Sequence, residues 1–515
     1  MKTHRYAIGV DIGTTSTKAV VFTEKGEQVH QHSIDYPLSA PMTGAAEQDP
    51  EEIFTAVVQS VKLVVKNSAI NPSEILCLSF SAAMHSLIAI DSSNKLLTKS
   101  ITWADNRSAK QANSLKQDEK GRAIYHRTGT PIHAMSPLVK LIWLRNEQPD
   151  LFEKSAKFIS IKEYVFYRIF QTYIVDYSMA SATGLMDLKE LVWDKEAMEI
   201  AGITEQHLSK LVPTTHIVDS MNEVIAAEMG ISANTPIVIG ASDGVLSNLS
   251  VGAISPGIVA VTVGTSGAVR AVINQHRTDV KERLFCYVLT DNYWVIGGAV
   301  NSGGIILRWI RDNLGENEVA IAQQQDRDPY DLLISLAQTV PPGAEGLIFH
   351  PYLAGERSPL WNANASGSFV GMTLRHTKAH LIRAMLEGIV LNLYLVAQAL
   401  QEEIGEFKTI MATGGLMKNI FFRQLLADIF NCEINVPNSY ESGSLGAAVL
   451  GLYALGKIPD LNAVSQMLGQ SSQYQPIPEN VEVYQKIIPM YTRILQQLQG
   501  EYDRLAAMAT ELNNK

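Results

Sequence analysis

Two short turns of nearly the same composition each follow an apolar segment of the chain. One lies in IGVDIGTTS at 8–16 and the other in VAVTVGTSG at 259–267. Glycine lets the backbone approach a phosphate group closely, and the neighbouring hydroxyls donate hydrogen bonds to its oxygens. Two such turns are suited to holding one nucleotide from both sides, although a hairpin turn without a ligand has the same pattern. The candidate phosphate contacts are Gly13, Thr14, Thr15, Gly264, Thr265 and Ser266.

Charged residues flank only the first of these turns. Asp11 precedes it and Lys18 follows it, whereas the second turn has Thr262 and Val269 at the corresponding positions. A carboxylate is a ligand for hydrated Mg²⁺, and a lysine ammonium neutralises phosphate. The first turn is therefore the predicted metal side of a nucleotide site. The motif GxxxxGK[ST] does not occur in the sequence, so the predicted site is not a P-loop.

A third candidate, Asp243, directly follows the apolar run TPIVIGAS at 235–242. A carboxylate at the point where a buried strand opens into a loop suits a general base, and it suits equally well the N-cap of a following helix. The segment GASDG at 240–244 also matches GxSxG, which would make Ser242 the nucleophile of a hydrolase. We keep the hydrolase as a second enzyme class, although it leaves both Gly-Thr turns unexplained.

Two further polar segments lie at the ends of expected strands. His85 lies in SAAMHSLIAID between two apolar runs, and Asp105 and Arg107 lie in ITWADNRS between a short strand and a helix. A carboxylate beside a guanidinium can hold a polyol or an acid through several directed hydrogen bonds. The alternatives are a structural histidine and a helix cap, with Arg107 a structural partner of Asp105.

The elements that must position these residues are those of an α/β protein, because β-rich blocks alternate with long amphipathic helices. The opening block predicts strands at 6–12 and 19–22, a hairpin turn at Lys25-Gly26 and a helix at 51–66. The second half predicts strands around 285–300 and at 408–415, helices at 301–315, 377–404 and 419–430, and a helix of small residues within 440–457.

The repeated turns predict two related domains. Gly13 and Gly264 lie 251 residues apart, which is close to half of the chain. We therefore predict an N-terminal domain at 1–250, with the first phosphate turn, and a C-terminal domain at 251–515. The repeat is short, and coincidence between two β-hairpins is the alternative.

Composition excludes several classes of protein. The 515 residues carry a formal net charge of −10, so no overall positive field attracts a nucleic acid or an acidic membrane surface. Cys77, Cys286 and Cys432 lie too far apart for a disulfide framework or a zinc site. Only four apolar residues, 7–10, precede Asp11, which is too few for a signal peptide. We expect a cytoplasmic protein.

One stretch, 237–269, is apolar enough to be compared with a membrane span. It contains a single charge, Asp243, but also six Gly, five Ser and Pro256. Buried strands joined by turns explain this composition better, so we expect no membrane partner.

Together these segments resemble the FGGY family of carbohydrate kinases over nearly the whole chain. Two long family motifs correspond to MSPLVKLIWLRNE at 135–147 and GSFVGMTLRHTKAHLIRAMLEGI at 367–389. The resemblance implies two ribonuclease H-like domains, as in hexokinase, actin and the Hsp70 ATPase region, with ATP and sugar meeting in the cleft between them. The other segments that share it are Asp11–Lys18, Trp103–Arg107, Asp243 and Gly264–Ser266.

The resemblance also implies roles for individual residues. Asp243 would be the base that faces the substrate hydroxyl, and Asp11 and Asp243 would support Mg²⁺. Gly304, Gly415 and Asn419 fall where relatives hold the rest of the nucleotide. The sugar contacts would be Met84, His85, Asp105, Arg107 and Asp243.

The combination of SAAMHSLIAID, ITWADNRS, RTGTPIHAMSP and VIGASDGVLSNL is most similar to family members that phosphorylate gluconate, at its 6-hydroxyl. Glycerol kinases have Arg-Glu where this chain has Met84-His85, and xylulokinases usually have MHG where it has Met84-His85-Ser86. The alternatives are a family kinase for a pentulose or polyol, and a non-enzymatic nucleotide-gated protein like actin or Hsp70. The implied small molecules are ATP, Mg²⁺ and a sugar acid.

The C-terminal segment 483–512 is amphipathic, with apolar residues alternately three and four apart. Packing on its own domain and a contact in a homodimer both explain this spacing. The stripe consists of Ile488, Tyr491, Leu495, Leu498, Tyr502 and Leu505.

Overall fold

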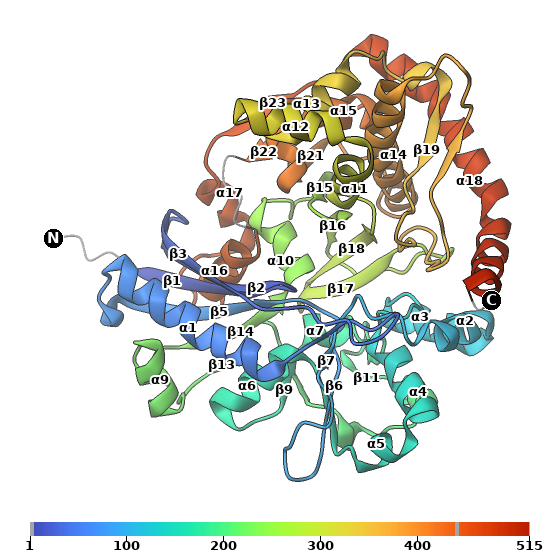
Figure 1. The fold of residues 1–515 in the computed structure, drawn as a ribbon. Coiled ribbons are helices and arrows are strands. Elements are labelled where there is room, and N and C mark those ends of the chain that lie inside the picture. Colours follow the sequence, from blue (N-terminus) through green and yellow to red (C-terminus); the bar gives the residue numbers. More distant parts are fainter. Residues whose placement is uncertain (1–4, 438–441, 514–515) are drawn as a thin grey trace. The chain divides into compact units, whose positions relative to one another are not determined.

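A computed structural model describes residues 5–437 and 442–513 (Figure 1). The chain alternates between two compact units. Unit 1 comprises the described residues of Met1–Ser255, Val272–Ile296 and Glu441–Gly469, and unit 2 those of Pro256–Ala271, Gly297–Tyr440 and Gln470–Lys515. The domain boundary between residues 250 and 251 stays a prediction.

The first sheet has six strands in the order β13-β14-β5-β1-β2-β3. β1 pairs antiparallel with β2 and parallel with β5, and β5 pairs parallel with β14 (Figure 1). The predicted opening hairpins are confirmed, including the turn in which Gly26 has a φ of 80°. The strands are β1 (Tyr6–Ile12), β2 (Ser16–Thr23), β3 (Gln28–Asp35), β5 (Ile75–Ala82), β13 (Ile217–Val218) and β14 (Ile237–Ser242).

The second sheet has seven strands in the order β17-β18-β16-β15-β21-β22-β23. β15 pairs antiparallel with β16 and parallel with β21, and β21 pairs parallel with β22. The strands are β15 (Ile258–Val263), β16 (Gly267–Ile273), β17 (Phe285–Thr290), β18 (Tyr293–Val300), β21 (Thr409–Thr413), β22 (Glu433–Pro437) and β23 (Ser471–Tyr474).

The two sheets share one topology, which confirms the predicted repeat. In the first sheet, β1 pairs antiparallel with β2 and parallel with β5; β5 pairs parallel with β14, and β14 pairs antiparallel with the edge strand β13. In the second sheet, β15, β16, β21, β22 and β23 repeat this arrangement in the same order. β1 corresponds to β15, and both Gly-Thr turns therefore connect equivalent strands. Coincidence between two hairpins does not produce this shared order of strands.

The helices predicted from the sequence are present, and several others, such as those at 119–128 and 161–170, were not predicted. The stretch 237–269 was expected to contain strands joined by turns, but a helix, α10, lies between β14 and β15, as the N-cap alternative for Asp243 implied. Its sequence GVLSNLS is buried almost throughout, so the surrounding unit overrides its low helix propensity. The principal helices are α1 (Pro50–Ser68), α2 (Ala109–Gln117), α3 (Glu119–Thr128), α4 (Pro137–Glu147), α6 (Ile161–Phe170), α7 (Tyr177–Ser181), α8 (Lys195–Ala201), α9 (Glu223–Met229), α10 (Asp243–Ser250), α11 (Gly304–Leu314), α12 (Glu316–Gln325), α13 (Pro329–Gln338), α14 (Lys378–Ile404), α15 (Ile420–Phe430), α16 (Ser442–Ala454) and α18 (Pro478–Asn513).

Two apolar helices illustrate how burial decides their role. α14 is the one helix among the described residues that is long and apolar enough to cross a membrane, but 83% of its apolar window is buried inside the structure. α16 is the predicted helix of small residues; residues 440 and 441 of that prediction lie outside the described part of the chain. Both are core helices.

The amphipathic C-terminal segment forms α18. Its Ile488, Tyr491, Leu495 and Tyr502 are buried, and the Tyr491 ring lies 4.3 Å from the ring of His350 in unit 2. Leu505 is exposed. Most of the stripe therefore packs on its own unit, as the first of the two interpretations expected.

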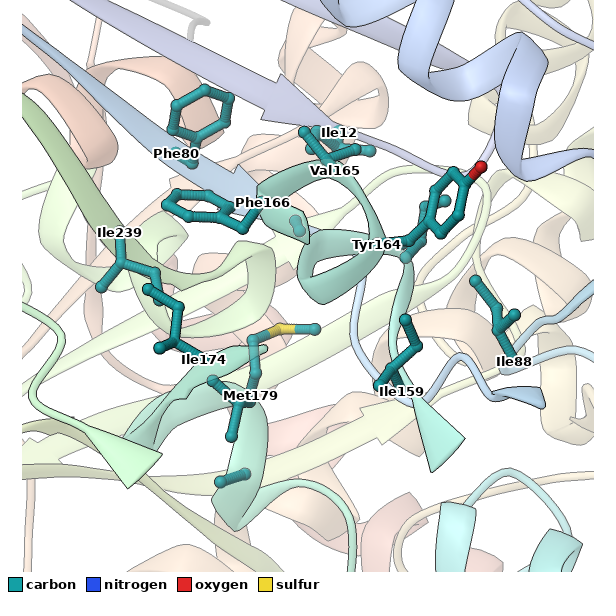
Figure 2. Close-up of a cluster of buried hydrophobic side chains, with 14 of the residues drawn as sticks. Ile12, Phe80, Ile88, Ile159, Tyr164, Val165, Phe166, Ile174, Met179 and Ile239 are labelled. Carbon is teal, nitrogen blue, oxygen red and sulfur yellow. The ribbon is translucent and has the colours of Figure 1, made fainter. Parts of the chain in front are cut away.

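The core of unit 1 lies directly behind the strands that carry the candidate site. Figure 2 shows Val165 and Phe166 of α6 facing Ile12 of β1 and Phe80 of β5. The rings of Phe80 and Phe166 meet edge to face at 5.2 Å. Close-packed side chains of this kind hold the strand ends in one position, which a catalytic site requires.

Candidate active site

Asp11 and Asp243 lie at the same edge of the first sheet. Asp11 pairs with Ser81 of β5, and Ser81 in turn pairs with Ala241 of β14. Asp243 follows β14 directly, so both carboxylates stand at the carboxyl ends of parallel strands. One strand, β5, separates their strands, which places the two backbones about 10 Å apart at a spacing of roughly 4.8 Å per strand. Ligand sites in open α/β sheets lie at this edge.

Three neighbouring groups surround the carboxylate of Asp11. Ser81 Oγ donates a hydrogen bond to it at 2.6 Å, and Lys18 is its cross-strand partner on β2. The first turn of α16 lies against the carboxylate, because a Cβ atom at Gly443 would come within 2.4 Å of Asp11 Oδ2. A helix N-terminus carries partial positive charge and stabilises an anion. Glycine is required at 443 for this approach.

Asp243 is the first residue of α10, and its Oδ1 accepts a hydrogen bond from the Gly244 amide at 2.6 Å. Ser242 occupies the N-cap position, so the alternative of Asp243 as the cap is wrong. Ser242 is fully buried, and its Oγ pairs with Ser178 Oγ at 3.0 Å. A hydrolase nucleophile must be accessible to its substrate, so the structure gives no support to the GxSxG interpretation.

Buried charges that sequence analysis did not identify lie behind Asp243. Lys162 of α6 forms an ion pair with Asp176 at 2.8 Å, and its ammonium also donates to the carbonyl oxygen of Ala241 at 3.3 Å. Burial lowers the pKa of Lys162, and the Asp176 carboxylate opposes this shift. This pair fixes the end of β14 at Ala241, two residues before Asp243. Local sequence offers no signal for it, because the partners come from separate elements.

The first Gly-Thr turn is anchored through its carbonyl oxygens. Tyr36 Oη donates to the Gly13 carbonyl at 2.7 Å, and Gln48 Nε2 donates to that of Thr14 at 2.6 Å. Trp103 Nε1 donates to Thr14 Oγ1 at 2.9 Å, which ties the turn to the segment containing Asp105. These hydrogen bonds direct the carbonyl oxygens of the turn toward the protein. A turn that binds an anion requires this, because the anion is bound by amides and hydroxyls and is repelled by carbonyl oxygens. The neighbouring Thr15 is exposed.

His85 occupies the connection between β5 and β6 (Ile88–Ile90), as the sequence predicted. It is buried and has a φ of 70°, a conformation that few residues other than glycine adopt. Its Nε2 lies 3.1 Å from Tyr287 Oη, and the Tyr287 ring stacks on Phe285 at 4.5 Å. Met84 packs beside it against the core of unit 1. A non-glycine residue held in this conformation at a strand end is a candidate functional residue.

Asp105 and Arg107 lie between β7 (Ser100–Ile101) and α2, and they bind one another. Arg107 Nη2 lies 2.8 Å from Asp105 and 2.6 Å from Glu47, and its guanidinium carbon stands 4.7 Å from the centre of the Trp143 ring. Burial opposes the charge, but the two carboxylates outweigh it and raise the pKa of Arg107. These ion pairs favour the alternative in which Arg107 is a structural partner. Sequence analysis missed Glu47, which lies 60 residues before Arg107.

Unit 2 contains a cavity of about 620 Å³. Five of the predicted nucleotide contacts line it together, whereas Ser266 is outside the lining set and Gly13, Thr14, Thr15 and Lys18 belong to unit 1. Sequence analysis missed the apolar and aromatic residues of the lining, because apolar residues spaced along a helix look the same in sequence whether they line a cavity or pack in the hydrophobic core. The predicted residues in the lining are Gly264, Thr265, Gly304, Gly415 and Asn419, and the missed ones include Leu307, Arg308, Tyr330, Ile334, Leu416 and Phe422.

α11 begins directly on the second Gly-Thr turn. The Gly304 amide donates to the Gly264 carbonyl at 2.7 Å, and the Ile305 amide donates to that of Thr265 at 3.0 Å. A Cβ atom at Gly303 would lie 2.7 Å from the Ser266 carbonyl oxygen, so only glycine allows this contact. These bonds hold the turn and the first residues of α11 together, so that Gly264, Thr265 and Gly304 line the same cavity.

Asn419 has a structural role as well as a place in the cavity. It caps α15, since its Oδ1 accepts from the Phe421 amide at 2.9 Å, and its Nδ2 lies 3.4 Å from Asp331 of α13. The cavity is thus lined by residues of a phosphate-type turn, Gly264 and Thr265, together with the aromatic and apolar residues Tyr330, Ile334 and Phe422. This is the composition of a site for a ligand with a flat apolar ring and charged groups.

The donor set fits a magnesium ion better than a metal held by the protein alone. Within residues 5–437 and 442–513, no group of three or more His, Cys, Asp or Glu side chains is arranged to hold a metal ion. Mg²⁺ in phosphoryl-transfer enzymes is bound by one or two carboxylates together with waters and phosphates. Asp11 and Asp243 at one sheet edge match that pattern.

The duplicated sheets and the phosphate-type turns define the protein as an α/β protein of two related units, of a class suited to nucleotides. Residues 6–250 match the N-terminal domain of the FGGY family of carbohydrate kinases, and residues 259–455 match its C-terminal domain. The chain belongs to this family and is a carbohydrate kinase.

Known relatives cover nearly the whole chain. It is 53% identical over 512 residues to a gluconokinase of Bacillus licheniformis, with 99% of each chain covered. The crystal structure of a gluconate kinase from Lactobacillus acidophilus is 39% identical, with a TM-score of 0.92, and covers 98% of this chain and 100% of its own. A structure described as a ligand-bound xylulose kinase from Lactobacillus acidophilus has the same identity and TM-score, with 97% and 100% covered.

Proposed function

We propose that this kinase transfers the γ-phosphoryl group of ATP to the 6-hydroxyl of gluconate. The observation that carries the choice of substrate is the 53% identity to a gluconokinase over 512 residues. Sequence similarity of this extent, spread over both family domains, includes the segments around Met84, His85, Asp105 and Asp243. The products are ADP and 6-phosphogluconate.

In this proposal Asp243 is the general base. Its carboxylate accepts the proton of the 6-hydroxyl while that oxygen forms a bond to the γ-phosphorus and the bond between this phosphorus and the β,γ-bridging oxygen of ATP breaks. Its position supports the role, because it follows a buried strand and stands at the first residue of α10. The N-terminus of α10 carries partial positive charge, which suits a carboxylate at this position.

The residues of the two units would divide the nucleotide between them. The cavity of unit 2 would take the adenosine and part of the phosphate chain, with Thr265 and Ser266 near the phosphates and Gly304, Gly415 and Asn419 along the rest. Gly13, Thr14, Thr15 and Lys18 of unit 1 would contact the transferred group. Asp11 and Asp243 would hold Mg²⁺, which, when bound, neutralises charge on the phosphates.

For the acceptor, we propose contacts from Met84, His85 and the segment that contains Asp105 and Arg107. Gluconate has a carboxylate, and a desolvated anion needs donors or a cation. His85 donates in either protonation state through one of its ring nitrogens. Arg107 is already bound to Asp105 and Glu47, so any part it takes would use the donors that remain on its guanidinium.

A coupled assay tests the substrate. ATP consumption is measured with gluconate, xylulose, ribulose and glycerol at matched concentrations. We expect the largest kcat/KM for gluconate. A larger value for xylulose would establish the second candidate, which the Lactobacillus acidophilus structure described as a xylulose kinase favours. ATP binding without phosphorylation of any acceptor would instead favour the nucleotide-gated binding protein.

The remaining expectations concern context. We propose that the enzyme works in the cytoplasm on small molecules alone, without a nucleic acid or a membrane as partner. We also propose a homodimer, which light scattering after size-exclusion chromatography tests directly: a mass of 56.5 kDa would identify a monomer and overturn the proposal.

A further inference from the structure

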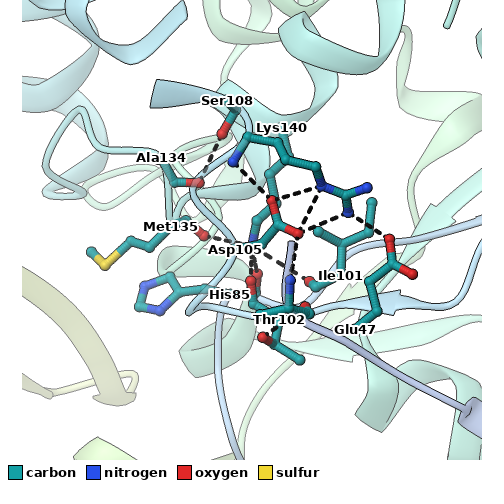
Figure 3. Close-up of polar contacts among 11 residues, drawn as sticks. Glu47, His85, Ile101, Thr102, Asp105, Ser108, Ala134, Met135 and Lys140 are labelled. Atoms are coloured by element: carbon teal, nitrogen blue, oxygen red, sulfur yellow. Dashed lines mark hydrogen bonds and ion pairs between the residues drawn. The ribbon is translucent and has the colours of Figure 1, made fainter. Parts of the chain in front are cut away.

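A fully buried lysine, Lys140, lies on α4 at the centre of the polar cluster in Figure 3. Its ammonium donates to the carbonyl oxygens of His85 at 2.6 Å, Thr102 at 2.7 Å and Met135 at 2.9 Å. A fourth carbonyl, that of Ile101, is 3.5 Å away. The three short bonds use all three donors of the ammonium group.

The carbonyl oxygens belong to three different connections of unit 1. One is the connection with His85, the second leads from β7 through Thr102 to Asp105, and the third ends at Met135 immediately before α4. Other bonds also join them: Leu87 and Ile101 exchange two backbone hydrogen bonds of 2.9 Å beside His85 and Thr102, and Ser108 Oγ donates to the carbonyl of Ala134 at 3.0 Å. Lys140 binds a carbonyl oxygen of each of the three connections, including both segments that carry the proposed acceptor contacts.

The cost of burying this charge indicates that it serves a purpose beyond filling the core. A buried ammonium is unfavourable unless hydrogen bonds replace its water, and an apolar side chain would fill the same space without that requirement. Burial lowers the pKa of Lys140 to about 7, with the Asp105 carboxylate opposing and the Arg107 guanidinium adding to the shift. The carbonyl oxygens stabilise the charged form.

We propose that Lys140 is a positioning residue for the acceptor site. By holding the His85 carbonyl it keeps that residue in its left-handed conformation, and by holding Thr102 it fixes the start of the segment that carries Asp105 and Arg107. In this role Lys140 does not touch the substrate; it acts on the acceptor site by holding these two segments in place. The inference rests on the proposed function, because it assigns these segments to the sugar.

The test compares Lys140→Met with Arg145→Met. Arg145 is on the same helix and donates to a backbone carbonyl, that of Ile200 at 3.0 Å, outside the three connections. Both changes remove a cation bound to carbonyl oxygen, and both are expected to lower stability. We expect Lys140→Met to raise the gluconate KM about tenfold or more, the effect of losing roughly one strong contact, with the ATP KM within twofold of wild type. Arg145→Met should leave both KM values unchanged.

Hydrogen exchange gives a second measurement that needs no substrate. In Lys140→Met the amides of 84–87, 101–106 and 133–136 should exchange about tenfold faster or more, while those of α8 keep the wild-type rate. In Arg145→Met the amides of α8 should exchange faster, while those of 84–87, 101–106 and 133–136 keep the wild-type rate. If Lys140→Met does not fold, Lys140→Gln, whose amide donates to two of the carbonyls, takes its place in both measurements.

The outcomes separate the two proposals. A wild type that does not phosphorylate gluconate refutes the proposed substrate, and Lys140 is then judged by hydrogen exchange and by the KM of the acceptor that is used. An active wild type whose acceptor KM and local exchange are unchanged by the loss of Lys140 refutes the positioning role. Equal rises in the gluconate and ATP KM values would also overturn it, since they indicate a general structural effect.

Discussion

At the scale of single residues, type and spacing identified two carboxylates at strand ends, but not the partners that determine which groups of each residue remain free. Asp11 and Asp243 were predicted at strand ends and lie at one sheet edge. Arg107 was predicted beside Asp105, but its second carboxylate, Glu47, comes from a distant segment. Lys140 gave no signal at all, because it lies within the largely apolar sequence of α4. Long-range pairs of this kind depend on the tertiary fold.

Asp243→Asn tests the proposed base. The substitution keeps the size of the side chain and removes its ability to accept a proton, so kcat should fall roughly 10²–10⁴-fold. The Kd for ATP, measured by calorimetry, should change little, because the cavity proposed for the nucleotide belongs to unit 2. Ser242→Ala is the matched control: it should remain active in a kinase, whereas a GxSxG hydrolase would lose all activity. Turnover of Asp243→Asn close to wild type would refute the role.

Arg107→Lys tests whether the guanidinium recognises the substrate or supports the site. A lysine cannot reproduce the bonds to both Asp105 and Glu47, so the free energy of unfolding should fall by about 1–3 kcal/mol. We expect kcat/KM to decrease by the same factor for gluconate and for a neutral sugar alcohol of equal length. A loss confined to gluconate would show instead that Arg107 binds the carboxylate.

At the scale of elements, local pattern predicted most of the strands and helices that carry the site. The hairpin of β1 and β2 followed from apolar runs and turn residues, and α14 and α15 followed from their periodicity. α10 was expected only in the alternative that made Asp243 the N-cap of a helix, because its small and polar residues, such as Ser247 and Asn248, are poor helix formers. Burial in unit 1 compensates for this low propensity. The approach of α16 to Asp11 was also beyond sequence analysis, since it joins segments more than 400 residues apart.

Gly443→Ala tests this approach. A methyl group would lie 2.4 Å from Asp11 Oδ2, so either the carboxylate or the first turn of α16 must move. We expect a stability loss of about 1–3 kcal/mol together with a fall in kcat. The matched control is Gly500→Ala in α18, where no atom lies within 4 Å; alanine there should stabilise the helix by about 0.5–1 kcal/mol and leave kcat unchanged. Wild-type kcat in Gly443→Ala would show that the position of Asp11 tolerates the methyl group.

At the scale of the whole molecule, a repeat of only a few residues predicted a duplicated architecture. The strand order of the two sheets confirms it, because equivalent strands carry the two Gly-Thr turns. What the sequence did not predict is that the chain alternates between the units, with Val272–Ile296 and the described part of Glu441–Gly469 returning to unit 1. Segment exchange of this kind leaves no local pattern, since each strand or helix is formed by the same local rules in either unit.

The stability of the molecule should depend on pH through His350, which is fully buried in unit 2. Its Nε2 lies 3.1 Å from the Tyr491 carbonyl oxygen and its Nδ1 3.2 Å from Ser368 Oγ. Burial lowers the pKa of His350 to about 4, and the Tyr491 carbonyl opposes the shift only in part. Below pH 6.5 the unfolded chain therefore binds a proton that the folded chain does not, and stability falls as the pH decreases.

The size of this effect follows from the two pKa values. The pKa of His350 is 6.5 in the unfolded chain and about 4 in the folded chain. The free energy of unfolding therefore falls by about 2 kcal/mol at pH 5, and by about 3 kcal/mol once the pH lies below both pKa values. Other buried groups also titrate; Glu163, for example, has a pKa raised to about 7 by burial and contributes with the opposite sign. The measurement is therefore a difference: urea unfolding of wild type and of His350→Gln, which keeps a donor for Tyr491 but does not titrate, at pH 7.5, 6 and 5. The stability of wild type relative to the variant should decrease steadily with acidification. A difference that stays constant over this range would show that His350 does not change its protonation state on unfolding.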